Sequence, residues 1–285
     1  MSISFNFELL RPSIRQALTE DIGFGDITTL SSVPAEFNAS ATIFPKEPCT
    51  LAGVKVAALV FEELDPSLKV EILKEDGTSS NPFDVTLNVT GSARSILTAE
   101  RTALNFIQRL SAIATSTRFY VNRIQGTGAR IIDTRKTTPN LRLFEKFAVL
   151  CGGGENHRKG LYDQVLLKDN HLKVIRRLGG DGMHAAVRQA REMFPGKVVE
   201  IEVESVIQLN EAIAAGADII MLDNMPPALM RECVKINAGR TKLEASGGIN
   251  SDTVRIVAET GVDFISIGAL THSVKAIDFS LEMND

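Results

Sequence analysis

Basic side chains are concentrated in one stretch of the sequence, residues 130–177. This stretch holds 11 Lys and Arg against 5 Asp and Glu, a net charge of +6, whereas the whole chain has a net charge of −4. Two adjacent cations, Arg135 and Lys136, follow an apolar run, and His157 and Arg158 follow three consecutive glycines. An arginine presents two parallel N–H donors to a carboxylate or phosphate, and a lysine presents a point charge. A local positive excess in an acidic protein indicates a site for a small anion, although a solvated basic surface is the commoner reason.

Lys168 ends another apolar run, Val165–Leu167. A lysine in this position can bind an anion, extend along apolar surface as a structural residue, or form a Schiff base once its pKa is lowered, as in barrel aldolases. The neighbouring cations favour anion binding, and the Schiff base is kept as an alternative.

Two carboxylates, Glu202 and Asp223, end later apolar runs. Opposite a cationic wall, carboxylates can accept hydrogen bonds from sugar hydroxyls, hold Mg²⁺ beside a diphosphate, or stabilise a developing positive charge. Glu200 lies two residues before Glu202, so in a strand both side chains point to the same face. The pattern leaves open whether Glu200 shares the role of Glu202.

The elements that must position these side chains alternate from residue 129 onward. Strands are predicted over 130–133, 165–168, 198–203, 218–222, 242–245 and 264–267, and helices over 183–194, 206–215, 227–236 and 251–260. This alternation predicts a parallel sheet. Polar residues follow the strand ends, as in α/β barrels, and glycine-rich turns at Ser246–Gly248 and Gly268 are suited to phosphate binding. Because only six strands are readable, we expect an open, incomplete barrel.

The first part of the chain has a different pattern. Short strands over 41–44, 69–73 and 85–89, helices over 8–20 and 54–64, and the loop EDIGFGDITT occur without strict alternation, which predicts an α+β sandwich. A long helix follows from about residue 93 towards 123, with apolar residues at spacings of three and four.

Composition excludes several classes of protein. The net charge of −4 argues against a nucleic-acid surface. Cys49, Cys151 and Cys233 are far apart and have no zinc-site spacing, so we expect reduced thiols. The first residues carry charges too early for a signal peptide, and no apolar run approaches membrane length. We therefore expect a cytoplasmic protein without a membrane partner.

Two histidines lie outside the basic stretch. His184 falls on a predicted helix and is expected to be structural. His272 comes just after the final glycine turn, where it could bind a ligand, cap a helix or be buried.

Nine stretches in order resemble the quinolinate phosphoribosyltransferase family. They are EDIGFGDITT, TAERTALNFIQRLSAIAT, ARIIDTRKTTP, AVLCGGGENHRKGL, LLKDNH, IEVES, IIMLDNM, EASGGIN and ISIGALTHS, and they span nearly the whole chain. The resemblance implies an α/β protein with an N-terminal α/β sandwich domain and an open α/β barrel of about seven strands. We place the first domain at residues 1–115, joined by 273–285, and the barrel at 116–272.

The resemblance also implies the reaction. Quinolinate and phosphoribosyl pyrophosphate would give nicotinate mononucleotide, CO₂ and pyrophosphate with Mg²⁺ as cofactor. The family works as a homodimer at least, with each site completed by the neighbouring subunit, and the sequence leaves open a hexamer. This activity belongs to NAD biosynthesis.

Site residues are carried over by motif. The quinolinate carboxylates would be surrounded by Arg135, His157, Arg158 and Lys168, with Arg101 arriving from the partner subunit. Phosphate groups would be held by Lys136, Ser246, Gly247, Gly248 and Gly268, with His272 nearby, and the ribose and metal would be addressed by Glu202 and Asp223. Among these, Lys136, Lys168, Glu202 and Asp223 are the expected catalytic residues.

Two departures from the family pattern and three alternatives accompany this prediction. Asn140 stands where Gly is usual, and Phe147 stands where Tyr is common. The alternatives are a paralogue of the same fold associated with molybdate transport, an aldolase that uses Lys168, and an anion-binding regulatory protein. LLKDNH argues against the paralogue, and Glu202 and Asp223 argue against a protein that only binds.

Overall fold

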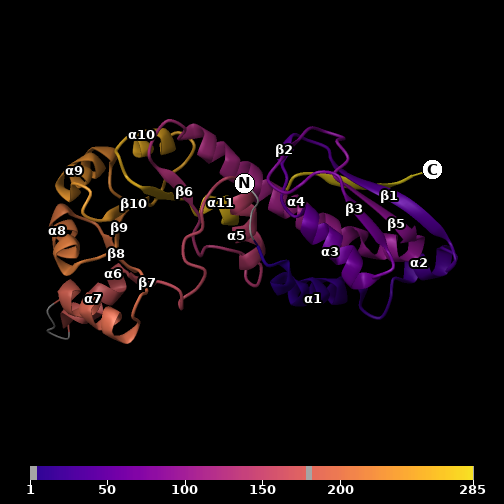
Figure 1. Cartoon of the computed structure of the whole chain (residues 1–285), viewed down its shortest axis with the longest axis horizontal. Coiled ribbons are helices and arrows are strands. Elements are labelled where there is room, and N and C mark those ends of the chain that lie inside the picture. The colour runs from indigo at the N-terminus through magenta and orange to yellow at the C-terminus, as the bar shows by residue number, and fades with distance from the viewer. Residues whose placement is uncertain (1–4, 178–181, 285) are drawn as a thin grey trace. The chain divides into compact units, whose positions relative to one another are not determined.

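The chain folds into two compact units, each made of more than one segment. The computed structural model describes residues 5–177 and 182–284. Residues up to Arg118, Thr137–Gly154 and the residues from Ala269 onward form the first unit. Phe119–Lys136 and Glu155–Gly268 form the second. Helix α4 (Ala93–Arg123), predicted over these same residues, begins in the first unit and ends in the second (Figure 1).

A four-stranded antiparallel sheet organises the first unit. Its order is β12 (Phe279–Met283), β1 (Asn38–Pro45), β5 (Leu87–Ser92) and β3 (Lys69–Ile72). The short strands β2 (Cys49–Thr50) and β4 (Ser79–Ser80) form a separate pair. The last strand in the sequence thus pairs with the first, which brings residues near the C-terminus into the N-terminal sheet.

The core of the first unit lies between this sheet and its helices. The helices are η1 (Phe7–Leu10), α1 (Arg11–Ile22), α2 (Ile27–Ser32), α3 (Val54–Leu64) and α4. Helix α3 is apolar almost all round and α4 has an apolar stripe, so both bury large surfaces, such as those of Phe61 and Ile107. Helix α2 falls where a loop is predicted. It is too short for a periodic pattern and is capped by Asp26, whose Oδ1 accepts the Thr29 N–H at 3.0 Å.

Helix α5 (Arg142–Cys151) belongs to the first unit, although the sequence placed residues 137–154 in the barrel. Phe144 stacks on Phe106 of α4 with ring centroids 4.9 Å apart. Phe147 packs against two aromatic rings near the start of the described chain, Phe5 and Phe7. These buried contacts, rather than the position of α5 in the sequence, decide its unit, and the ring of Phe147 points into this cluster.

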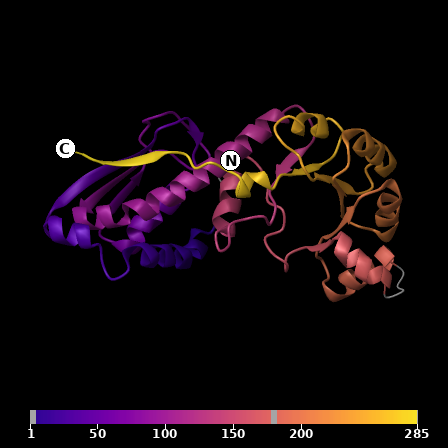
Figure 2. The same ribbon diagram turned by 180° about the vertical axis from the view of Figure 1, so that it is seen from behind.

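A six-stranded parallel sheet organises the second unit. Its order is β6 (Arg130–Ile132), β11 (Phe264–Ser266), β10 (Lys242–Ser246), β9 (Ile219–Asp223), β8 (Val199–Val203) and β7 (Val165–Leu167). Helices follow the strands on the outer side: α6 (Asp169–Arg177), α7 (Gly182–Met193), α8 (Val206–Ala215), α9 (Pro227–Asn237) and α10 (Val254–Ala258) (Figure 2). Helix α11 (Ala269–His272) comes after the last strand and belongs to the first unit.

Neighbouring strands of this sheet are consecutive in the chain except β6, which pairs with β11. The sheet is therefore a barrel that stays open between β6 and β7, which confirms the predicted fold class. Among the described residues it has six strands, and a single parallel bridge between Ile132 and Glu155 lies at its open edge. Directly after Glu155 the chain leaves the sheet, and Asn156 and His157 donate hydrogen bonds to the Asp133 carboxylate instead. No helix within the described ranges is long and apolar enough to span a membrane.

Candidate active site

A pocket of about 330 Å³ opens at the carboxyl ends of the parallel strands, within the second unit. Eight of the predicted residues line it: Arg135, Lys136, His157, Arg158, Lys168, Glu202, Asp223 and Ser246. Five others were not predicted: Thr134, Leu166, Met221, Glu244 and Ser266. Since parallel strands end at the same edge of a sheet, residues far apart in the sequence meet here.

The remaining predicted residues are not among those that line the pocket in the described part of the chain. Arg101 is exposed on α4 and His272 is exposed at the end of α11, both in the first unit. Gly247, Gly248 and Gly268 are in the turns after β10 and β11. Gly247 has φ of +94°, and a Cβ there would lie 2.1 Å from Asn224 Oδ1, so this turn requires glycine.

The cationic side of the pocket contains two neighbouring arginines. Burial lowers the pKa of Arg158 from its ordinary value, and the adjacent charge of Arg135 lowers it further. An arginine nevertheless stays protonated in proteins, so the two guanidinium groups are held close together against their mutual repulsion. An anion with two carboxylates placed between them would relieve that repulsion.

The acidic side of the pocket has the opposite imbalance. Lys168 Nζ lies 3.2 Å from Glu202 Oε2. Burial raises the pKa of Asp223, and the negative charges of Glu202 and Glu204 raise it further. Two carboxylates that repel one another next to a single lysine favour a bound cation or a ligand that develops positive charge.

The loop that carries His157 and Arg158 is anchored by Asp133. This aspartate is fully buried at the end of β6. Its carboxylate accepts the backbone N–H of His157 and the side-chain amide of Asn156, both at 2.8 Å. Gly153, just before the loop, has φ of +87°, and the hydrogen bonds to Asp133 hold the loop at the end of β6, where the predicted second basic pair lies beside the first.

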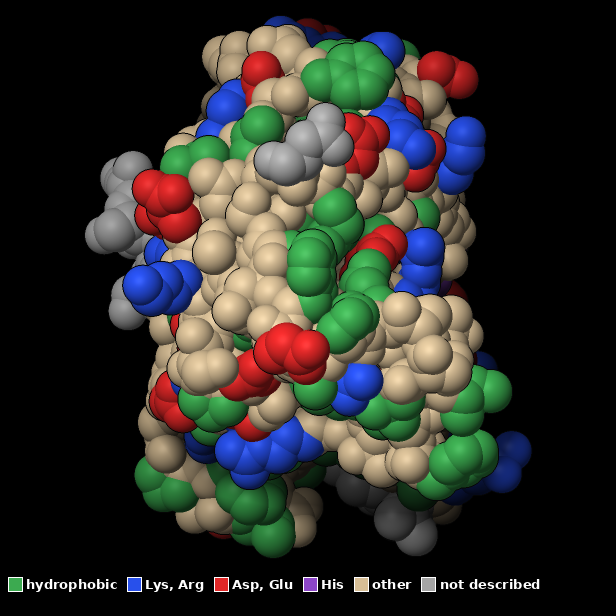
Figure 3. Space-filling model, turned by 90° about the vertical axis from the view of Figure 1, so that its right-hand side faces the viewer, with side chains coloured by type: hydrophobic (Ala, Val, Ile, Leu, Met, Phe, Trp, Pro, Cys, Tyr) green, Lys and Arg blue, Asp and Glu red, His purple; other side chains and the backbone are tan. Residues whose placement is uncertain are grey.

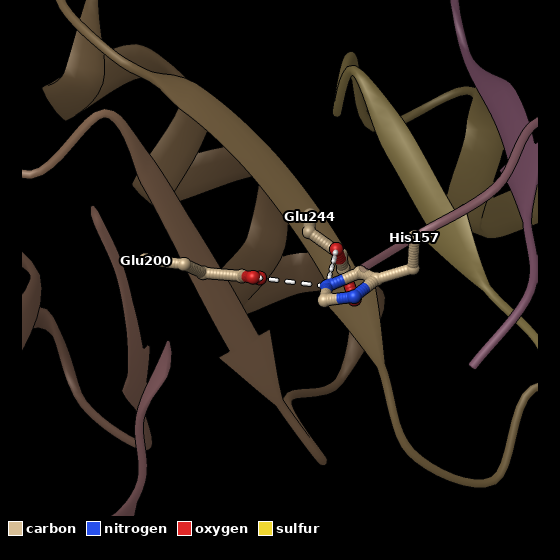
Figure 4. Close-up of side chains that lie close together, drawn as sticks. All are labelled: His157, Glu200 and Glu244. Carbon is tan, nitrogen blue, oxygen red and sulfur yellow. Dashed lines mark hydrogen bonds and ion pairs between the residues drawn. The ribbon is translucent and has the colours of Figure 1, made fainter. Parts of the chain in front are cut away.

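Two of the lining residues, His157 and Glu244, meet a third residue, the buried Glu200 (Figure 4). His157 Nε2 lies 2.9 Å from Glu200 Oε2 and 3.5 Å from Glu244 Oε2. Burial raises the pKa of Glu200 to about 7 and that of Glu244 to about 8, the latter also because of the neighbouring Glu200. Candidate ligand atoms of the three residues lie within 4.8 Å of one another, a spacing compatible with a metal ion.

Sequence reasoning left Glu200 undecided and missed Glu244. The structure separates Glu200 from Glu202: Glu200 turns to His157, whereas Glu202 pairs with Lys168. The available signal for Glu244 is its place in the strand KLEAS, two residues before Ser246, because residues at that spacing share a face.

A barrel whose strand ends form a divided anion and cation pocket is typical of enzymes that act on charged small molecules. The family model for the quinolinate phosphoribosyl transferase C-terminal domain matches residues 113–282, and the model for the N-terminal domain matches residues 26–111. The chain belongs to the quinolinate phosphoribosyltransferase family, as its motifs predicted.

Individual relatives agree over nearly the full length. A probable carboxylating nicotinate-nucleotide pyrophosphorylase of Bacillus subtilis is 42% identical over 275 residues, which cover 96% of this chain and 93% of that protein. The solved structure of NadC from Streptococcus pyogenes is 41% identical, covers 100% of both chains and has a TM-score of 0.92. The nicotinate-nucleotide pyrophosphorylase structure from Francisella tularensis is 40% identical, covers 99% of this chain and 98% of that one, and has a TM-score of 0.91.

Proposed function

We propose that this enzyme transfers a phosphoribosyl group from phosphoribosyl pyrophosphate to quinolinate and decarboxylates the product. The products are nicotinate mononucleotide, CO₂ and pyrophosphate. The observation that carries the proposal is that one pocket brings together two neighbouring arginines, Lys136 and Lys168 with two mutually repelling carboxylates, Glu202 and Asp223. The names of the relatives support this reaction.

The cationic side fits the substrates by charge. Quinolinate carries two adjacent carboxylates, which suit the forked donors of Arg135 and Arg158. Lys168 also lines the pocket and adds a third positive charge, and Lys136 is proposed to bind the phosphates of the donor. The Ser246–Gly248 turn, in which Gly247 and Gly248 have positive φ, offers backbone N–H groups to a phosphate.

The acidic side fits the transition state. When the bond from ribose C1 to the diphosphate breaks, positive charge develops on the ribose ring. Glu202 and Asp223 are fixed carboxylates that stabilise this charge without reorganising at the moment of reaction. The quinolinate nitrogen then supplies the electron pair for the new bond to C1.

Decarboxylation follows from the pyridinium formed in that step. The carboxylate next to the ring nitrogen leaves as CO₂, and its bonding electrons stay on the ring carbon beside the positive nitrogen. A proton then replaces the lost group. The protein's part is to hold the other carboxylate and the ring in place through its cations, so this step needs no general base.

Mg²⁺ is proposed as the cofactor. The two carboxylates Glu202 and Asp223 fit it, since carboxylate oxygens are its preferred protein ligands and their repulsion is relieved by a cation. When bound, the ion neutralises charge on the leaving diphosphate.

A second copy of the chain is proposed to complete each site. Arg101 is exposed on α4 and is not among the residues that line the pocket of its own chain. We therefore assign it to the pocket of a second copy. Large apolar side chains are also exposed around α2: Phe24 (96% exposed), Ile27, Leu30 and Phe37. Figure 3 shows the side of the first unit on which α2 lies, with hydrophobic side chains at several places on its surface. Exposed groups of this kind mark protein–protein interfaces.

The cytoplasmic location stays a prediction.

The aldolase alternative is not favoured by the surroundings of Lys168. Its side chain is 48% exposed and lies 3.2 Å from the Glu202 carboxylate, whereas a lysine that forms a Schiff base is typically enclosed in an apolar pocket or next to another cation.

One assay tests the function. The purified chain is incubated with Mg²⁺, phosphoribosyl pyrophosphate and quinolinate labelled in the carboxylate beside the ring nitrogen. We expect nicotinate mononucleotide and labelled CO₂ in equal amounts. A parallel reaction with nicotinate in place of quinolinate is the control, because it lacks the second carboxylate. If neither product forms from quinolinate at any pH or metal concentration tried, the proposed reaction is wrong.

A further inference from the structure

The side chain of His157 is held on both of its ring nitrogens. The backbone N–H of Arg158 donates to Nδ1 at 2.8 Å, so Nδ1 must present a lone pair. The ring proton therefore sits on Nε2, which donates to Glu200 Oε2 at 2.9 Å. Only 8% of the side chain is exposed. Both ring nitrogens are thus engaged with the protein itself rather than directed at a ligand in the pocket.

Glu200 receives a second donor from the same loop. The side-chain amide of Gln164 donates to Glu200 Oε2 at 2.6 Å. The backbone carbonyl of Gln164 in turn accepts a long hydrogen bond, 3.4 Å, from Arg158 Nη1. The contacts form a closed ring that runs from the Arg158 N–H through His157, Glu200 and Gln164 back to the Arg158 guanidinium.

Glu244 lies beside this ring on strand β10, on the same face of the sheet as Glu200 of β8. It is 1% exposed, its carboxyl group interacts with that of Glu200, and it faces His157 and Ser266. Two adjacent buried carboxyl groups beside a neutral imidazole hold one proton between them. The raised pKa of Glu244 agrees with its being the protonated member.

We propose that Glu200 is a positioning residue for quinolinate binding: through His157 and Gln164 it fixes Arg158 at both its backbone and its guanidinium group. His157 then acts through Arg158 and does not itself touch the substrate, which differs from the role that the family motif implies for it. This inference rests on the proposed function for its substrate, but the ring of contacts exists independently of it.

The same contacts argue against a metal ion on these three residues. A histidine that binds a metal through Nε2 carries its proton on Nδ1 and donates it to an acceptor. Here Nδ1 faces another donor, the Arg158 N–H, at 2.8 Å. A metal on Nε2 would place two N–H groups against each other.

The first test reads the tautomer of His157 directly. The chain has four histidines, so nitrogen-15 spectra of labelled protein are simple, and a His157→Asn variant assigns the signal. We expect the Nε2–H tautomer in the free protein and no change on saturation with quinolinate. An imidazolium signal, a proton on Nδ1, or a shift to a metal-bound form with zinc recovered from the purified protein would overturn the proposal. This readout does not require activity, so its failure is distinct from failure of the proposed function.

The second test separates binding from chemistry. Loss of a hydrogen bond to a charged group corresponds to about a ten- to hundredfold effect. We expect Glu200→Ala to raise KM for quinolinate by about that factor, with kcat and KM for phosphoribosyl pyrophosphate changed by less than about threefold. Glu200→Gln keeps one acceptor and should recover part of the loss.

Glu211→Gln is the matched control, since Glu211 is an exposed glutamate of the same unit. Circular dichroism and melting curves confirm that each variant is folded. If Glu200→Ala equals the control, or if kcat and both KM values change together, Glu200 does not position Arg158.

Discussion

Two fully buried glutamates, one in each unit, have opposite surroundings. Glu145 in the first unit accepts two hydrogen bonds from the Arg109 guanidinium, at 2.9 and 2.6 Å, and one from the Thr138 N–H at 3.2 Å. Glu244 in the second unit faces a carboxyl group and a neutral imidazole. The buried charge of Glu145 is therefore balanced by a cation within the first unit, whereas Glu244 in the second unit lies beside a second carboxyl group. The contrast separates two roles for buried charge: the Glu145 pair stabilises the fold, whereas Glu244 belongs to the lining of the pocket.

The Arg109–Glu145 pair is structural because of what it joins. Arg109 Nη2 also donates to the Thr138 hydroxyl at 2.7 Å and to the Thr271 carbonyl at 3.0 Å. One guanidinium group thus ties α4 to α5, to the segment before α5 and to α11. Thr138 and Thr271 each lie only a few residues beyond predicted site residues, Lys136 and Gly268, so this pair fixes the chain just outside the site.

The largest expected effect is on the pocket of the second unit. Arg158→Ala should reduce kcat/KM for quinolinate by about a thousandfold, because two charge-assisted hydrogen bonds to a carboxylate are lost. Steady-state kinetics with quinolinate varied measures this. Arg158→Lys, which keeps the charge but not the fork, should fall between the variant and the wild type. A melting temperature equal to that of the wild type shows that the loss of activity is not due to unfolding.

Loss of the Arg109–Glu145 pair should affect stability instead. Arg109→Ala leaves Glu145 buried without its partner and should lower the free energy of unfolding by about 3–5 kcal/mol. Urea denaturation followed by circular dichroism gives the value. Lys173→Ala, which removes an exposed ion pair with Asp169, is the control and should leave the free energy of unfolding nearly unchanged. Equal effects of the two substitutions would contradict the contrast between buried and exposed pairs.

Mixed subunits test whether the first unit contributes a charge to another copy's pocket. Arg101→Ala and Arg135→Ala should each be nearly inactive alone. After subunit exchange, half of the dimers are hybrid and each hybrid has one intact site, so activity should return to about a quarter of the wild-type value. The measurement is product formation before and after exchange, which native mass spectrometry monitors. Exchange without recovery would show that the two arginines do not serve sites shared in this way.

The smallest expected effect concerns pH and Glu244. Its pKa in the folded chain is raised from 4.5 to about 8 by burial and by Glu200. A carboxyl group whose pKa is raised on folding contributes stability that is fully present below the pKa of the unfolded chain. That contribution is lost as pH rises through the pKa of the folded chain, about 8. Glu244→Gln cannot ionise, so its melting temperature should fall less between pH 6 and pH 9. At pH 9 it should exceed that of the wild type by about 2–4 °C. If the melting temperatures of the two proteins fall by the same amount between pH 6 and pH 9, Glu244 does not ionise in this pH range.

Much of the fold and most of the pocket could be predicted from the sequence. The βα alternation placed the six strands to within a residue or two. Polar residues at strand ends indicated six of the pocket's lining residues, and the glycine-rich loop indicated two more, His157 and Arg158. These features are local, since each depends on a run of residues and the one that follows it.

What the sequence could not predict depends on contacts between distant residues. Glu202 and Glu244 lie opposite Met221 on either side of β9, and this register decides that Glu244 reaches the pocket. Helix α5 carries two buried charged residues, Glu145 and Lys146, in a pattern typical of a surface helix. Only the position of Arg109 on α4 explains why one of these charges can be buried there.

The pairing of β1 with β12 has a consequence for how the protein is made. Ser40 and Asn284, which hydrogen bond at the end of this pair, are 244 residues apart in the chain. At ribosomal rates, β1 waits on the order of ten to fifty seconds for its partner to emerge. During that time β5 can cover one side of β1 while the other side remains an open edge, a template for wrong pairing with other nascent chains. The sheet whose first strand is synthesised earliest is therefore completed last, by the strand that is synthesised last.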